Sequence, residues 1–151
     1  MPENIIIEEV SPVDRDFLHL VKQLDDHLAL LDGSMHEFYD GYNSPSQLSR
    51  AIILKDNGQA LACGGLKLDA ERAEIKRMFT LPEHRRKGYA AKVLQFLENL
   101  SRESGLTHCQ LETGRDMKGS IEFYLKQGYR QIPNFPPYEK VESSVCFEKA
   151  L

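Results

Sequence analysis

The sequence predicts an α+β fold: a central mixed, mostly antiparallel sheet of about seven strands, flanked by helices. Three observations support this fold class. Short β-branched segments recur along the chain, an Asn-Gly pair separates two of them, and a long amphipathic helix separates two others. Asn-Gly between apolar segments is the strongest short-range signal of a hairpin, whereas two strands joined by a helix run parallel in one sheet. We therefore expect one parallel pair, formed by the fourth and fifth strands.

Local signals place each element in order. The first helix begins after Asp14, which can cap it, and Gly33 and Ser34 follow its last apolar turn. Residues 35–45 are polar and aromatic without a clean period, so a loop and a short helix both remain open there. The second helix stops at Gly105. The expected strands are residues 5–10, 51–55, 60–68, 73–81, 108–113, 129–132 and 145–149, and the second and third helices begin near residue 86 and cover about 119–127.

Length and composition favour a single globular domain over residues 1–151 and argue against several classes of function. A chain of 151 residues is the usual size of one domain. Its 19 basic and 23 acidic side chains give a net charge of −4, without the basic balance typical of nucleic-acid-binding proteins. Neither a membrane-spanning apolar run nor a secretory signal is recognisable. Three widely spaced cysteines argue against a disulfide framework. We expect a cytoplasmic protein that binds neither nucleic acid nor a membrane.

The segment 74–91, EIKRMFTLPEHRRKGYAA, carries the chemistry. In it a strand leads through a basic turn into the start of a helix. Backbone N–H groups at a helix start have no intrahelical partner, and the helix dipole places partial positive charge there, so this turn predicts an anion site. Gly88 permits close approach of a ligand to the backbone, and the neighbouring cations can pair with phosphate oxygens. The glycine motifs of P-loops and dinucleotide-binding folds are absent from the sequence.

This turn resembles the phosphate-binding motif of the GNAT superfamily of acyl-CoA-dependent N-acyltransferases, Arg/Gln-x-x-Gly-x-Gly/Ala, at Arg85, Gly88 and Ala90. The segment 120–129, SIEFYLKQGY, is similar to the second motif of the family, and the element order agrees over essentially the whole chain. The chain looks closest to small bacterial-type members. The resemblance implies a GNAT fold whose fourth and fifth strands splay apart. It also implies an enzyme that transfers an acetyl group from acetyl-CoA to a primary amine by direct attack in a ternary complex.

The resemblance also implies a set of cofactor-binding residues. The pyrophosphate of acetyl-CoA would lie on backbone amides of the turn and helix start, and the pantetheine arm would pair, like a strand, with the fourth strand. A backbone N–H near Phe79 would polarise the acetyl carbonyl. Met117 departs from the family pattern, which often has an asparagine there that contacts the cofactor arm. The expected cofactor-binding residues are Met78, Phe79, Thr80, Arg85, Arg86, Lys87, Gly88, Tyr89, Ala90 and Ser120.

Two catalytic roles follow from the same resemblance. Tyr124 stands where many members have a tyrosine that acts as general acid for the departing CoA thiolate, and a phenol with a pKa near 10 can donate that proton. Glu74 lies eleven positions before Arg85, as a glutamate does in histone-type members, and would accept the proton of the attacking amine. Glu112, on the fifth strand, is the rival base. Core packing for Tyr124 and a solvated strand end for Glu74 are the structural alternatives.

The acceptor would lie against the first helices and the loop between the last two strands. The expected substrate-binding residues are Tyr39, Tyr42, Glu112 and Tyr138, because aromatic rings and a carboxylate suit a small cationic amine. Packing of these rings as a lid is an equal alternative. A peptide or protein amine, and a CoA-binding sensor without catalysis, are alternative functions. No histidine pair has the spacing of metal ligands, so we expect no metal. Homodimers are common in the family, and the sequence leaves the oligomeric state open.

Overall fold

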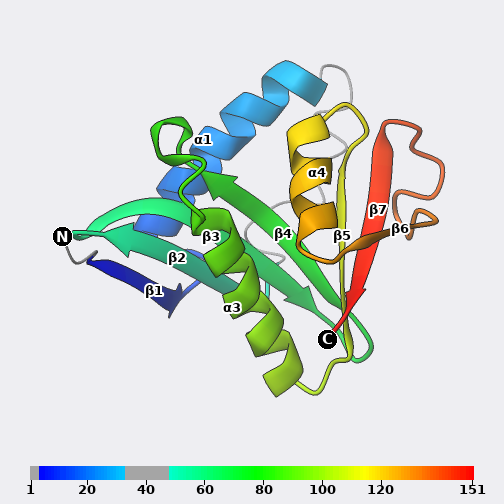
Figure 1. Ribbon diagram of the computed structural model, residues 1–151, viewed down its shortest axis with the longest axis horizontal. Coiled ribbons are helices and arrows are strands. Elements are labelled where there is room, and N and C mark those ends of the chain that lie inside the picture. Colours follow the sequence, from blue (N-terminus) through cyan, green and yellow to red (C-terminus); the bar gives the residue numbers. More distant parts are fainter. Residues whose placement is uncertain (1–3, 33–47) are drawn as a thin grey trace.

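The computed structural model describes residues 4–32 and 48–151, which form one mixed sheet of seven strands with helices on both faces (Figure 1). The strand order is β1-β2-β3-β4-β5-β7-β6, and every neighbouring pair except β4–β5 is antiparallel. The predicted fold class and the predicted parallel pair are confirmed. The strands are β1 Ile5–Val10, β2 Arg50–Asp56, β3 Gln59–Leu68, β4 Ala73–Thr80, β5 His108–Gly114, β6 Arg130–Ile132 and β7 Ser144–Ala150, and the helices are α1 Arg15–Asp32, the 3-10 helix η3 Pro82–His84, α3 Tyr89–Glu103 and α4 Lys118–Lys126.

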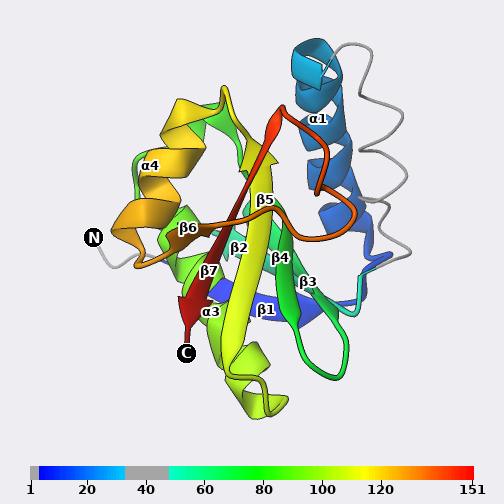
Figure 2. The same ribbon diagram turned by 90° about the vertical axis from the view of Figure 1, so that its right-hand side faces the viewer.

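The two faces of the sheet have separate cores. Helix α1 covers one face, and α3 and α4 cover the other (Figure 2). Asp14 caps α1 as predicted, since its Oδ2 accepts the backbone N–H groups of Asp16 and Phe17 at 3.0 and 3.1 Å. The core under α1 contains Phe17, Leu20, Val21 and Leu24, whereas the core under α3 and α4 contains Val93, Leu94, Leu97 and Tyr124. No described helix is both long and apolar enough to cross a bilayer.

Helix α3 begins at Tyr89, three residues later than the sequence predicts. The delay has a backbone cause. Arg86 and Gly88 have φ angles of 66° and 81°, in the left-handed region, which a right-handed helix cannot include. Residues 85–88 are therefore a tight turn, and the unpartnered N–H groups of the helix start belong to the residues from Tyr89 onward.

Strands β4 and β5 pair over a short distance and then diverge. Their parallel register runs from Ala73↔Cys109 to Ile75↔Leu111 and goes no further. At this point β4 contains one residue more than β3 between the pairs Cys63↔Phe79 and Gly65↔Lys76, which makes a β-bulge. Arg77 lies within the bulge and has a φ of 60°. A bulge bends and twists its strand, so β4 leaves β5 and the predicted splay is formed.

The bulge also changes which side chains point to which face. Ile75 belongs to the core under α3 and α4, whereas Phe79 belongs to the core under α1. Positions four apart share a face in a regular strand, and the extra residue reverses that relation. Glu74 and Lys76 lie on the α1 face, and Arg77 beside them also points to α1, where its Nη2 bonds to Asp25 and to the Val21 carbonyl.

Candidate active site

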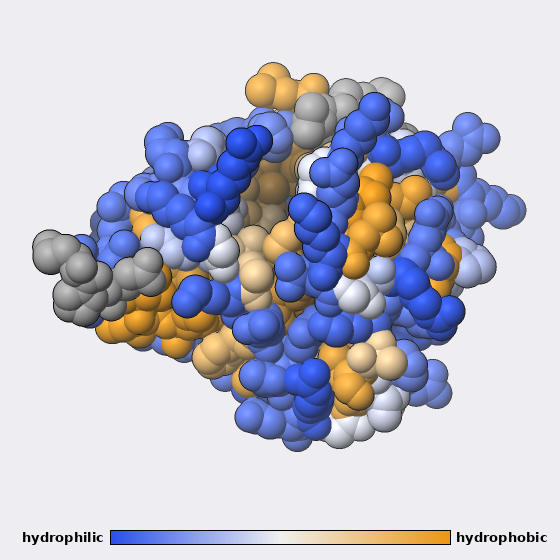
Figure 3. Space-filling view, viewed as in Figure 1, coloured by the Kyte–Doolittle hydropathy of each residue, from blue (hydrophilic) through white to orange (hydrophobic). Residues whose placement is uncertain are grey.

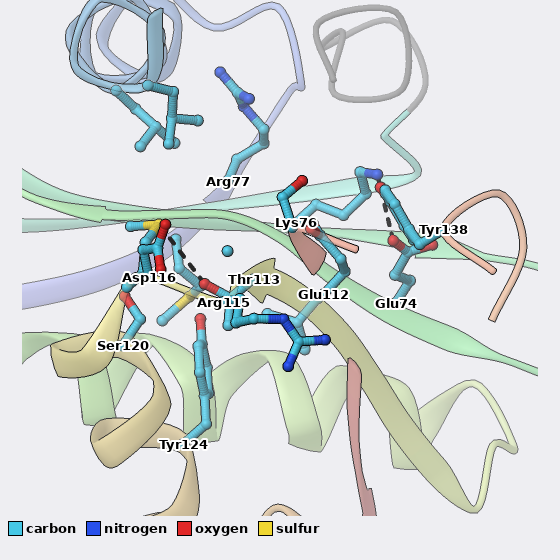
Figure 4. Close-up of a pocket in the computed structure, with 17 residues that line it drawn as sticks. Glu74, Lys76, Arg77, Glu112, Thr113, Arg115, Asp116, Ser120, Tyr124 and Tyr138 are labelled. Carbon is cyan, nitrogen blue, oxygen red and sulfur yellow. Dashed lines mark hydrogen bonds and ion pairs between the residues drawn. The ribbon is translucent and has the colours of Figure 1, made fainter. Parts of the chain in front are cut away.

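A cavity of about 220 Å³ fills the gap between β4 and β5 (Figure 4). β4 contributes residues 74–78 to its wall, and β5 with the turn after it contributes residues 112–117; α1, α4 and the β6–β7 loop supply the rest. Because helices from both faces of the sheet line it, the cavity passes through the sheet at the splay. Six of the residues expected to form the site meet there: Glu74, Met78, Glu112, Ser120, Tyr124 and Tyr138.

Tyr124 reaches the cavity from α4. Figure 4 shows its hydroxyl directed toward the gap between the strands, with Ser120 on the same helix beside it. The ring packs edge-on against Phe123 and Tyr129, with centroid distances of 5.1 and 5.8 Å, so its direction is fixed. Burial raises the pKa of the Tyr124 phenol, which therefore keeps its proton throughout the neutral range. The residue is thus a packed core aromatic whose protonated hydroxyl lies at the cavity wall.

Two carboxylates and a lysine gather on the opposite face of the sheet. Glu74 and Lys76 are two residues apart on β4, and their Oε2 and Nζ atoms form an ion pair of 3.3 Å. Lys76 is only 6% exposed, and burial lowers the pKa of its ammonium group, although the charge of Glu74 acts in the other direction. Glu112 approaches from β5 and accepts a hydrogen bond of 2.6 Å from Ser144 Oγ on β7. The alternative of a solvated strand end therefore does not describe Glu74, whose side chain is 14% exposed.

Tyr138 closes the cavity from the β6–β7 loop. It lies beside the Glu74–Lys76 pair in Figure 4 and is 1% exposed. Its ring packs edge-on against Phe135, with a centroid distance of 5.8 Å, and Cys146 lies in the same cluster. Asn134 Nδ2 ties the loop together through the carbonyls of Tyr138, Val141 and Ser144, at 3.0–3.3 Å. Tyr138 thus packs in the loop and also lies on the cavity wall, the two alternatives that the sequence left open. Tyr39 and Tyr42 lie outside the described residues.

The expected phosphate-binding turn lies along the same strand, beyond the cavity. Gly88 has a φ of 81°, and a Cβ added there would meet no atom within 4 Å, so the space beside it is open. Arg85 folds back onto β4, where its Nε donates to the Thr80 carbonyl at 3.0 Å and its guanidinium lies 5.8 Å from the centre of the Phe79 ring. The side chain of Tyr89 is buried in the core, so that residue offers only its backbone to a ligand.

Between the turn and the cavity, β4 presents an unpaired edge. Beyond Ile75 its β5-facing side has no strand partner among the described residues. Such an edge offers backbone N–H and C=O groups to an extended ligand. Figure 3 shows a hollow with an apolar floor between α4 and the turn before α3, over this part of the strand. A basic turn, an open strand edge and a cavity in series fit a ligand that is anionic at one end and extended toward the other.

Sequence reasoning missed several residues of the cavity wall. Lys76, Arg77 and Arg115 line it and were not expected there. Lys76 and Arg77 carry a recognisable signal, because two adjacent cations in the middle of an apolar strand are rarely buried without a specific partner. Met117, which departs from the family pattern, is the residue before α4, and its side chain makes no capping hydrogen bond to the helix. The Thr113 hydroxyl lies 3.8 Å from the Met117 sulfur.

Comparison with known proteins decides the family. The family model of the GNAT acetyltransferases matches residues 18–129. The chain belongs to the GNAT family. Its sequence is 29% identical over 151 residues to an IAA acetyltransferase of Azospirillum brasilense, across 98% of this chain and 99% of that protein.

Solved structures agree with this assignment. This GNAT protein superposes on an acyl-CoA N-acyltransferase from Klebsiella pneumoniae with a TM-score of 0.82 and 30% identity, over 97% of each chain. The PaiA N-acetyltransferase of Thermoplasma acidophilum, solved with coenzyme A, has the same fold at a TM-score of 0.76 and 17% identity, over 97% of this chain and 99% of that one. The protein is therefore an acyltransferase with the GNAT fold, and the resemblance inferred from its motifs is confirmed.

Proposed function

We propose that this GNAT acyltransferase transfers an acetyl group from acetyl-CoA to the primary amine of a small molecule. One observation carries the proposal: Tyr124 enters the gap between β4 and β5 from one face of the sheet, and Glu74 and Glu112 enter it from the other. A reacting carbonyl held in this gap has a proton donor on one side and two carboxylates on the other. Such an arrangement suits proton removal from an incoming amine and proton delivery to a leaving thiolate.

The backbone supports acetyl-CoA as the acyl donor, which supplies an activated thioester. Residues 86–90 offer backbone N–H groups and the positive end of the α3 dipole to the diphosphate. The open edge of β4 at Met78, Phe79 and Thr80 offers strand-like hydrogen bonds to the pantetheine arm. A backbone N–H near Phe79 stabilises negative charge on the acetyl oxygen, and the Ser120 hydroxyl lies on the α4 side of the cavity.

The two carboxylates have different roles toward the amine. Glu74 accepts the amine proton, directly or through one water, while Glu112 binds the ammonium form on arrival. Lys76 holds Glu74 in place through their ion pair of 3.3 Å. Tyr124 then donates its phenolic proton toward the thiolate that leaves. Holding both reactants in one cavity supplies much of the rate.

A small acceptor suits the cavity better than a peptide. Tyr138 is buried, and Asn134 ties the loop that carries it to the backbone of residues 138–144, which closes one side of the cavity. A peptide acceptor requires an open groove there. A CoA-binding sensor requires neither Tyr124 nor the two carboxylates, so their convergence in one cavity favours an enzyme.

Thermal unfolding with acetyl-CoA, CoA and ATP tests the donor site. A ligand at a hundredfold its Kd stabilises a protein by about 2.7 kcal/mol, and each kcal/mol moves the Tm of a chain this long by roughly 2–4 °C. We expect shifts with acetyl-CoA and CoA and none with ATP. Thiol release with a panel of amines then tests transfer, and direct attack predicts intersecting rather than parallel double-reciprocal lines. Absence of any shift with acetyl-CoA contradicts the proposal.

A further inference from the structure

We infer that the acceptor is a free amino acid, whose carboxylate binds Arg115 while its amine faces Glu74 and Glu112. The inference rests on the proposed function and narrows its acceptor class. It starts from a difference among the three cations of the cavity wall. Lys76 is ion-paired with Glu74, and Arg77 is ion-paired with Asp25. Within residues 4–32 and 48–151, Arg115 is the lining cation without a carboxylate partner.

Arg115 is nevertheless held in place. Its backbone N–H donates to the Ser143 carbonyl, and its Nε donates to the Glu142 carbonyl, each at 2.7 Å. The guanidinium is thus anchored through Nε, and within the described part of the chain its two terminal nitrogens have no hydrogen-bond partner. A fork of this kind matches the two oxygens of a carboxylate, and its anchoring reduces the entropy lost on binding.

The same short segment places Arg115 near the carboxylates. Residues 142 and 143 bind Arg115, and Ser144, the next residue, donates to Glu112 Oε2 at 2.6 Å. Figure 4 shows the Arg115 side chain running along β5 and the adjacent Asp116 pointing to the other side, near α4. A cation and an acid, each bonded to the segment 142–144, therefore lie on the wall of the same cavity. An α-amino acid, which carries its amine and its carboxylate on the same carbon, needs that juxtaposition.

The rest of the cavity wall fits the side chain of such an acceptor. Leu24 and Leu28 of α1 line the cavity together with Met78 and Met117, so an apolar side chain is accommodated best. A polyamine needs further carboxylates at a distance from the first pair. Beyond Glu74, Lys76 and Glu112, the charged groups of the described wall are Arg77, Arg115 and Asp116, so one further carboxylate stands there beside two cations.

Matched acceptors test the inference in the wild-type enzyme. Leucine and phenylalanine are compared with isoamylamine and phenethylamine, which lack only the carboxylate, and with leucinamide, which keeps a neutral carbonyl; spermidine represents polyamines. We expect kcat/KM for the amino acids to exceed that for the decarboxylated amines at least tenfold. A preference for leucinamide over leucine, equal rates for the matched pairs, or turnover of spermidine alone overturns the inference.

Variants locate the effect at Arg115. Arg115→Gln is expected to raise KM for leucine at least tenfold, with little change in kcat and little change for isoamylamine, and Arg115→Lys to recover part of the loss. Lys118→Gln removes a nearby exposed charge outside the cavity wall and serves as the control. An equal loss for leucine and isoamylamine in Arg115→Gln overturns the role of Arg115. If acetyl-CoA shifts the Tm but no amino acid is acetylated, this inference fails and the donor site stands; if acetyl-CoA does not bind, the proposed function fails as well.

Discussion

Glu74 and Tyr124 line one cavity from opposite faces of the sheet. Glu74 lies on the α1 face of β4, and Tyr124 belongs to the core under α3 and α4. Two groups on opposite faces of a sheet normally cannot act on the same molecule, because paired strands separate them. Here the divergence of β4 from β5 after Ile75 removes that barrier. The proposed proton acceptor and proton donor therefore reach one cavity because the two strands diverge.

Replacing Gly88 is expected to abolish acetyl-CoA binding. In Gly88→Val a β-branched residue would have to adopt a φ of 81°, at a cost of roughly 1–3 kcal/mol, or the turn would rearrange and move its N–H groups. Gly105→Val is a matched control, since Gly105 has a φ of 84°, equally open space, and a place at the far end of α3. Thermal shift with acetyl-CoA should disappear in the first variant and persist in the second. Unchanged acetyl-CoA affinity in Gly88→Val would place the donor site elsewhere.

Loss of the Tyr124 hydroxyl is expected to slow turnover and spare binding. Tyr124→Phe keeps the packed ring and removes the proton donor, so kcat should fall about 10²-fold while the acetyl-CoA thermal shift stays unchanged. Tyr129→Phe is the comparison, because the Tyr129 hydroxyl bonds to Glu98 Oε2 at 2.8 Å, away from the cavity. That change should lower the Tm and leave kcat nearly unaltered. Wild-type turnover in Tyr124→Phe would remove this residue from the acid role.

The two carboxylates are distinguished by their kinetic signatures. Glu74→Gln should lower kcat about 10²-fold at every pH tested, because the proton acceptor is lost. Glu112→Gln should mainly raise KM for the amine, because a binding charge is lost while the base remains. Steady-state kinetics between pH 5.5 and 9 separate the two effects. The reverse pattern would make Glu112 the base.

The three cysteines are expected to be unreactive in the folded protein. Cys63, Cys109 and Cys146 are each at most 1% exposed, and burial raises the pKa of Cys63 to about 12 and that of Cys146 to about 11. Because the thiolate is the reactive form, raised pKa values keep these groups protonated at pH 7–8. Titration with a chromogenic disulfide should detect no thiols under native conditions and three in denaturant. Rapid native labelling of any of them would contradict this burial, and it would also complicate thiol-release assays.

Periodicity and turn signals were sufficient to predict the sheet and its parallel pair, and the motifs shared with the GNAT family led to Glu74, Glu112 and Tyr124. These features depend on patterns that repeat along the sequence or on residues at fixed intervals. The bulge at Arg77 could not be predicted in the same way. A left-handed backbone is disfavoured for arginine locally, and it is stabilised here by contacts with Asp25 and Val21 of α1, more than fifty positions earlier.

The start of α3 and the role of Arg115 have similar explanations. Arg86 gave no sign of its positive φ, so the helix was placed three residues too early. Arg115 follows the LETG segment as an ordinary exposed cation, and only its bonds to residues 142 and 143, on a loop distant in sequence, show that its direction is fixed. Interactions between segments far apart in the chain determine these details, and a single sequence does not display them.

The extra residue in β4 reverses which face of the sheet the odd-numbered and even-numbered positions occupy. Upstream of the bulge even-numbered positions of β4 face α1, and downstream Phe79, an odd-numbered position, does so. Deleting one residue there would restore an unbroken alternation. Phe79 would then stand three positions from Ile75 and keep its place in the core under α1, but β4 would lose the bend that carries it away from β5. Conservative substitutions in this strand change single contacts, whereas a single-codon deletion would straighten it and close the passage through the sheet.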